Sequence, residues 1–107
     1  WKYFEPMDIG IISKRIRKYE IGKSNNCFVA LKDMITDDIN NKTKIVEYND
    51  IIIDILSSVS ASIEGKKILL KEFSWMATEA YKPVYEKLSS DVDLKDEALF
   101  ALERLNY

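Results

Sequence analysis

The sequence predicts an all-α fold: a compact bundle of four or five mostly antiparallel helices in a single domain over residues 1–107. Three observations support this prediction. Apolar residues recur three and four positions apart through most of the chain, as on the buried face of a helix. Only three glycines occur in the whole sequence. The polar links between the periodic segments are short, which favours antiparallel neighbours.

The first segment, residues 1–7, is rich in aromatic side chains. Because Pro6 disfavours helix in the residue before it, we expect an arm that lays Trp1, Tyr3 and Phe4 against the body of the domain. The chain opens on Trp1 rather than methionine, so we expect it to be a processed form or a fragment of a longer protein.

The first two helices are predicted over residues 8–22 and 26–39. Asp8 suits the N-cap of the first helix, and Gly22 suits the left-handed position that ends it. Residues 24–26 offer capping side chains for the second helix, and Asn40–Asn41 ends it. The apolar residues predicted to face inward are Ile9, Ile12, Ile16 and Tyr19 in the first helix and Phe28, Leu31, Ile35 and Ile39 in the second.

A third helix is predicted from Thr43 to Glu64–Gly65. Its weakest point is the β-branched run Ile51–Ile53, which has strand propensity. We prefer a helix because the apolar residues keep their spacing over about five turns, while acidic residues line the opposite side. The predicted inward residues are Ile45, Ile52, Leu56, Val59 and Ile63, and the acidic face consists of Glu47, Asp50 and Asp54.

A fourth helix is predicted from Lys66 or Lys67 to Leu88, with a kink or break about one turn before Pro83. Asp93, followed three residues later by Asp96, is close to a capping box and predicts a last helix that runs to Leu105. The predicted inward residues are Leu69, Phe73, Met76, Ala80, Val84 and Leu88 in the fourth helix and Leu94, Ala98, Ala101, Leu102 and Leu105 in the last.

The net charge of −2 hides an uneven distribution. Residues 1–32 carry seven Lys and Arg against three Asp and Glu, a balance of +4, whereas residues 33–64 carry two against seven, a balance of −5. Such asymmetry marks separate binding faces, or else the basic third packs beside the acidic third. We expect opposite faces.

The basic residues concentrate around Ile16, in the cluster Lys14, Arg15, Arg17 and Lys18. Four cations around one apolar anchor could bind phosphate, nucleic acid, an anionic membrane or an acidic protein face. The acidic face could bind a cation or a basic partner. For both groups the plainer interpretation is a solvated helix surface.

The sequence offers little for catalysis. Histidine is absent, and the three glycines lie too far apart to form a phosphate-binding loop. Cys27 has no second cysteine and no histidine to activate it, so we expect a small core residue. A carboxylate such as Glu72 or Glu79 is the remaining candidate for an enzyme. We therefore predict no enzyme activity, no metal and no cofactor.

The sequence favours a non-catalytic protein–protein interaction module, regulatory or involved in assembly, that binds another protein or itself. The predicted contacts are Trp1, Tyr3 and Phe4 on the arm and Trp75, Tyr81 and Tyr85 on the fourth helix, because Trp and Tyr are enriched at interfaces. The alternative is a nucleic-acid-associated regulator that uses the basic cluster. We expect an intracellular, cytoplasmic location and no membrane span, since the longest apolar runs are too short.

Overall fold

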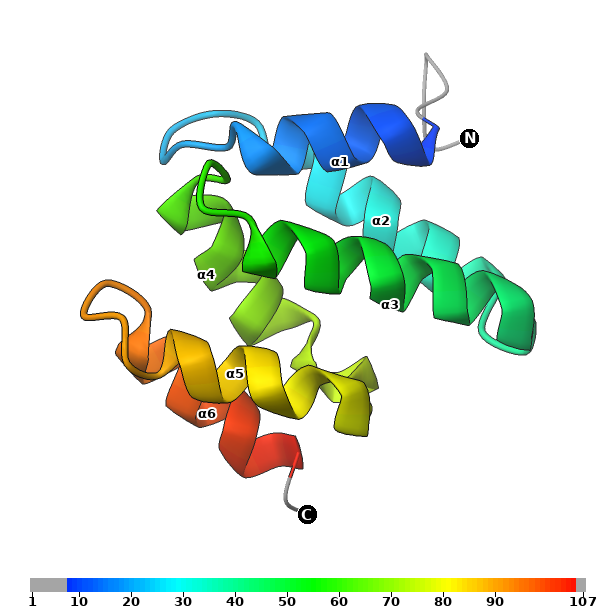
Figure 1. The fold of residues 1–107 in the computed structure, drawn as a ribbon. Coiled ribbons are helices and arrows are strands. Elements are labelled where there is room, and N and C mark those ends of the chain that lie inside the picture. Colours follow the sequence, from blue (N-terminus) through cyan, green and yellow to red (C-terminus); the bar gives the residue numbers. More distant parts are fainter. Residues whose placement is uncertain (1–7, 106–107) are drawn as a thin grey trace.

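The computed structural model describes residues 8–105, and this part of the chain is entirely helical and without strands, which confirms the predicted class (Figure 1). The described residues contain six α-helices rather than four or five. They are α1 (Ile9–Arg17), α2 (Asn26–Asp37), α3 (Lys42–Ser57), α4 (Ile63–Glu72), α5 (Lys82–Leu88) and α6 (Lys95–Leu105), with two 3₁₀ turns, η1 (Ser74–Met76) and η2 (Glu79–Tyr81), between α4 and α5.

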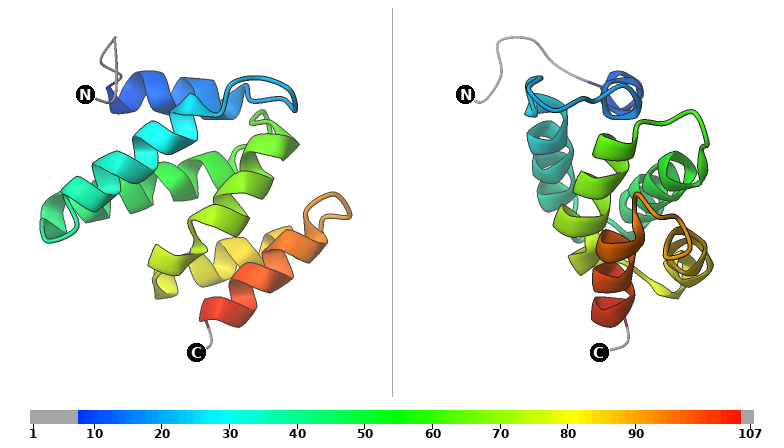
Figure 2. Two further views of the ribbon diagram at one scale, coloured as in Figure 1. Left: turned by 180° about the vertical axis from the view of Figure 1, so that it is seen from behind. Right: turned by 90° about the vertical axis from the view of Figure 1, so that its left-hand side faces the viewer.

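The helices form two groups joined by α4. One end of the molecule consists of α1, α2 and α3, and the other of α5 and α6 (Figure 2). Between them α4 contacts α1, α3 and α6. The chain reverses direction between α1 and α2 and again between α5 and α6, as predicted for helices joined by short links. The region Ile51–Ile53 is helical despite its strand propensity.

One apolar core runs through both groups. Most of the residues predicted to face inward are buried. They are Ile12, Ile16, Phe28, Leu31, Ile35, Ile52, Leu56, Leu69, Phe73, Leu88, Leu94, Ala98 and Ala101. Seven more of the predicted inward residues are partly buried and pack against this core: Ile9, Tyr19, Ile45, Met76, Val84, Leu102 and Leu105. The spacing of apolar residues therefore identifies most of the core.

The first helix is shorter than predicted. Asp8 caps α1 by accepting a hydrogen bond from the Ile11 N–H at 2.9 Å, but the helix ends at Arg17. Gly22 does have the expected positive φ, 94°, although it lies in the turn that follows rather than at the helix end. The last carbonyls of α1 have another partner, because the Ser62 N–H donates to the Arg17 carbonyl at 2.8 Å.

Four residues predicted to face inward are exposed. Ile39 lies beyond the end of α2, and Val59 lies in the link after α3, where it is 98% exposed. Ile63 is the first residue of α4 rather than the last of α3, and Ala80 lies in η2. In each case the apolar spacing continues past the point where the backbone leaves the predicted helix.

Gly65 does not end α3; it lies in the first turn of α4. A Cβ at this position would collide with the carbonyl oxygen of Ile16 in α1. The hydroxyl of Ser62 caps α4 by accepting from the Gly65 N–H at 3.0 Å. The glycine is therefore required by the close approach of α4 to the end of α1 and not by a helix terminus.

The predicted fourth helix breaks as expected before Pro83, which stands in the first turn of α5, where its missing N–H costs no hydrogen bond. The last helix begins at Lys95 rather than Asp93. The Asp93 N–H instead donates to the Asp91 carboxylate at 2.9 Å, so this segment forms a turn before the helix.

Candidate functional site

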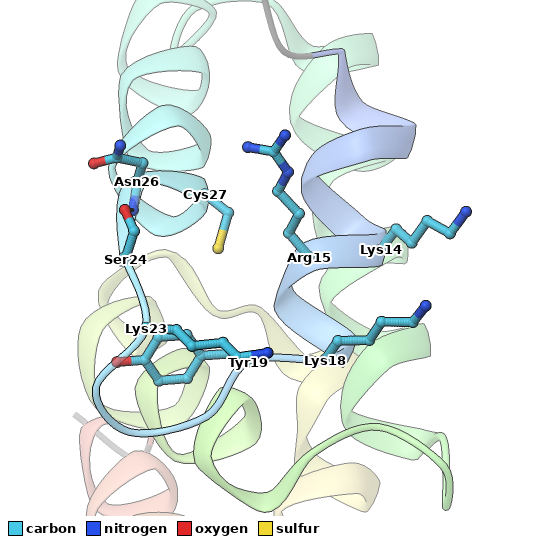
Figure 3. A pocket seen from close by; sticks show the side chains of 8 residues that line it. All are labelled: Lys14, Arg15, Lys18, Tyr19, Lys23, Ser24, Asn26 and Cys27. Atoms are coloured by element: carbon cyan, nitrogen blue, oxygen red, sulfur yellow. Dashed lines mark hydrogen bonds between the residues drawn. The ribbon is translucent and has the colours of Figure 1, made fainter.

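An open pocket of about 460 Å³ lies between α1 and the start of α2 (Figure 3). Four cations line it, three from α1 or its end and one from the turn that follows. The pocket residues are Lys14, Arg15, Lys18, Tyr19, Lys23, Ser24, Asn26 and Cys27. We call this the basic pocket. It brings together three of the four residues of the predicted basic cluster.

The cations do not converge on one point. Arg15 reaches across the gap toward α2, whereas Lys14 and Lys18 project side by side away from α2 (Figure 3). This follows from helix geometry, because residues four apart align on one face and the residue between them points elsewhere. The arrangement suits an extended anion that passes over several cations better than a single compact one.

The beginning of α2 adds positive potential to this pocket. The Ser24 hydroxyl accepts the Asn26 N–H at 3.2 Å, while the side chain of the N-cap residue Asn25 makes no capping hydrogen bond. The Phe28 N–H donates to the Asn25 carbonyl at 3.0 Å. The start of the helix nevertheless carries a partial positive charge from the aligned peptide dipoles. The pocket therefore combines the charges of its side chains with the positive end of a helix dipole.

Arg17, the fourth residue of the basic cluster, lies outside the basic pocket. Its guanidinium pairs with Asp54 of α3 at 2.5 Å. The expectation that the basic cluster and the acidic face lie on opposite sides is wrong for these two residues, since α1 packs against α3. Elsewhere on the acidic face, Glu47 pairs with Lys44 of its own helix at 3.7 Å. Asp50 is exposed.

Tyr19 lines the pocket, at the bottom of the view in Figure 3, but its ring is not free to stack on a ligand. Its ring packs edge-on against Phe28, with 5.1 Å between ring centroids and an interplanar angle of 88°. The neighbouring Lys23 pairs with Glu20 at 3.6 Å, and both side chains are well exposed. Tyr19 thus serves mainly the core, as its spacing predicts.

Cys27 is buried at the base of the pocket, which confirms the prediction of a small core residue. Burial raises the pKa of the Cys27 thiol, and the backbone N–H groups of Phe28 and Cys27, together with the Arg15 charge, only partly offset this effect. A thiol with a raised pKa stays protonated at neutral pH and is a poor nucleophile. The pocket therefore has no activated sulfur.

The predicted aromatic contacts divide into three groups. Trp1, Tyr3 and Phe4 lie outside the described residues. Tyr81 and Tyr85 are each 1% exposed, so the prediction that they contact a partner is wrong. Their rings lie 5.4 Å apart inside the core, because the break before α5 turns this face inward. Trp75 is 43% exposed and is available to a partner.

Trp75 lies on η1 beside α6. The Arg104 guanidinium lines the same shallow surface, where it donates to the Ser74 hydroxyl at 3.5 Å and covers the Phe100 ring at 5.5 Å. Trp, Phe and Arg are enriched at interface cores. This surface is a second place where a protein partner could bind.

The structure does not bring the remaining candidate catalytic or metal-binding side chains together. Glu72 and Glu79 are both exposed and belong to different elements, α4 and η2. Within residues 8–105 no three Cys, Asp or Glu side chains are grouped as metal ligands. Over the same residues, no helix combines the length and apolar character needed to cross a bilayer.

One largely buried lysine was missed by the sequence analysis. Lys66 is only 8% exposed, although lysine is rarely buried. Its position gave a usable signal: Lys66 precedes Leu69, Leu70 and Phe73 by three, four and seven residues, which is the spacing of a buried helix face. All three of those residues are buried.

Comparison with known proteins gives no family assignment. No protein-family model matches the sequence, and no curated protein or solved structure is significantly similar to it.

Proposed function

We propose that this protein is a non-catalytic binding module that docks an acidic segment of a protein partner over the basic pocket. The observation that supports it is the gathering of Lys14, Arg15, Lys18 and Lys23 with the start of α2 around one open pocket. Complementary charge between two surfaces increases the rate of association and disfavours the binding of partners with the wrong charge.

An acidic protein segment fits better than nucleic acid. Proteins that bind single strands supply aromatic faces on which bases stack, and the Tyr19 ring is instead packed edge-on against Phe28. The net charge of −2 also works against a long polyanion such as duplex DNA. A short acidic segment needs only the few cations of the pocket, whereas a long polyanion would also extend over acidic residues such as Asp54.

The test measures binding of a fluorescent peptide of repeated glutamates by anisotropy at two salt concentrations. The variant carries Lys14→Glu and Lys18→Glu together. A matched control carries Lys42→Glu and Lys71→Glu, which change the net charge equally at two exposed lysines on α3 and α4. We expect the first variant to bind at least about tenfold more weakly, since exposed ion pairs contribute up to about 1 kcal/mol each and the reversed charges also repel.

The control should retain most of the affinity. Equal weakening in both variants would show that net charge rather than the pocket determines binding, and it would overturn the proposal. Tighter binding of duplex DNA than of the peptide, with the steep salt dependence of phosphate contacts, would favour the nucleic-acid alternative instead. Light scattering of the protein alone shows whether the partner is a second copy.

A further inference from the structure

The structure contains a second cavity, on the side of α4 that faces α5. It has a volume of about 310 Å³ and lies at the end of α3, between α4, α5 and the turn before α6. Most of its lining is aliphatic: Leu56, Val59, Pro83, Val84 and Leu88. The charged residues in the lining are Lys66, Lys87 and Asp91. We call this the Lys66 cavity.

Lys66 is the unusual member of this lining. The residue is 92% buried, and within residues 8–105 its ammonium makes neither a hydrogen bond nor an ion pair. Burial lowers the pKa of Lys66, and the charge of Lys87 lowers it further, while Asp91 acts in the opposite direction. Among the described residues no fully buried side-chain nitrogen lacks a partner, so the Lys66 ammonium keeps contact with solvent through the open side of the cavity. The cavity therefore presents a partly desolvated cation that has no ion-pair partner among the described residues.

Asp91 does not fill that role. Its carboxylate accepts the backbone N–H of Asp93 at 2.9 Å and so belongs to the turn that precedes α6. It forms no ion pair with Lys66 or Lys87. With two lysines and one aspartate, the cavity keeps a net positive charge, which attracts anions and repels amines.

We propose that the Lys66 cavity binds a small organic anion, namely a monocarboxylate with an apolar body. The carboxylate pairs with the Lys66 ammonium, and the body covers the aliphatic wall made by residues of α3 and α5. The volume is at the lower end of the range for ligand pockets, about 300–1,000 Å³, so the ligand is a small one. This site is separate from the basic pocket, and its ligand is a metabolite-sized molecule rather than a protein segment.

The test uses hexanoate as the probe, with hexanol and hexylamine as matched controls for the apolar body. Amide chemical shifts of the full chain are followed by NMR during titration. We expect hexanoate to shift resonances from α4, α5 and the end of α3, and to bind at least tenfold more tightly than hexanol. Hexylamine should bind more weakly than either.

Two variants link this preference to Lys66. Lys66→Met keeps most of the side-chain volume but removes the charge, so hexanoate should lose its advantage over hexanol. The neighbouring Lys67, which pairs with Glu64 at 3.9 Å, provides the control Lys67→Met, and this variant should keep the preference. Should Lys66→Met fail to fold, Val84→Phe fills the cavity while leaving Lys66 in place, and it should abolish hexanoate binding. Absence of hexanoate binding to the unmodified protein, or unchanged binding in Lys66→Met or Val84→Phe, overturns the proposal.

Discussion

The Tyr81 hydroxyl donates a hydrogen bond of 2.6 Å to the side-chain oxygen of Asn49, and both residues are buried. This contact joins η2 to the middle of α3. It provides the polar partner that each side chain needs inside an apolar core. Tyr85, one turn further along, is equally buried but donates no hydrogen bond to a described residue.

These two tyrosines form a matched pair for mutation. Tyr81→Phe leaves Asn49 without its partner, and we expect a loss of about 1–3 kcal/mol in the free energy of unfolding. Tyr85→Phe removes a hydroxyl of the same kind without orphaning an acceptor, so its cost should be clearly smaller. Urea unfolding of both variants measures the difference. Equal losses would show that the Asn49 hydrogen bond adds nothing specific.

Gly65→Ala tests the close approach of α4 to α1. The added methyl group would collide with the Ile16 carbonyl oxygen, which is backbone and cannot easily move aside. We expect a loss of about 1–3 kcal/mol, as for other overpacked sites. The control is Gly10→Ala, where the new methyl group would meet only the Asp8 side chain at 3.2 Å. Thermal unfolding followed by circular dichroism distinguishes them, and a stable Gly65→Ala variant would contradict the observed packing.

Stability should fall at alkaline pH. Burial, together with the hydrogen bond that the phenol donates to Asp38, raises the pKa of Tyr48 to about 12. Burial also raises the pKa of Tyr81 and that of Tyr85. Unfolded tyrosines titrate near pH 10. Above that pH the unfolded chain loses protons that the folded chain keeps, so stability is complete below about pH 10 and declines as pH rises through the folded pKa values.

Thermal midpoints between about pH 8 and pH 12 check this expectation. Tyr85→Phe removes one of the three phenols and should make the decline shallower. Lys66 acts in the opposite sense, because its pKa is lowered in the folded state. Its unfavourable contribution disappears as pH rises to the unfolded lysine value, so a small gain precedes the decline. A midpoint that stays constant to pH 12 would contradict the burial of the phenols.

Lys66→Met should increase stability at neutral pH. The substitution removes a partly desolvated ammonium that forms no ion pair with a described residue, and it retains apolar contact with the cavity wall. We expect a gain of roughly 0.5–2 kcal/mol in urea unfolding, the range typical of a single stabilising substitution. Lys67→Met, at a more exposed position, should change stability little. A loss of stability in Lys66→Met alone would mean that the ammonium has favourable contacts in the fold.

Apolar spacing predicted the fold class and most of the core, because burial in a helix imposes that spacing directly. It failed where the spacing continued through a link. Val59 and Ile63 extend the pattern of α3, but Ser58 adopts an extended backbone conformation and Ser62 caps a new helix. A link between two helices can keep the apolar rhythm by chance, and only the caps reveal the break.

The candidate sites were less predictable because they depend on tertiary contacts. The cluster around Ile16 was visible in the sequence, but the pairing of Arg17 with Asp54 depends on how α1 crosses α3. Lys23 joins the basic pocket only because the turn after α1 folds back toward α2. Gly65 looked like a helix end, since a glycine required by close backbone contact has the same local sequence as one that ends a helix.

The charges at the two ends of α2 add to the dipole of that helix instead of opposing it. Its first residues face the basic pocket, while its last turn contains Asp37, is followed by Asp38 and has no basic side chain. Proteins usually place charge the other way round, and each reversed charge costs about 0.3–1 kcal/mol. The dipole of α2 and the charges at its two ends thus point in the same direction. A negatively charged surface nearby would exert a torque on this local dipole that favours turning the α1 side toward the surface before contact.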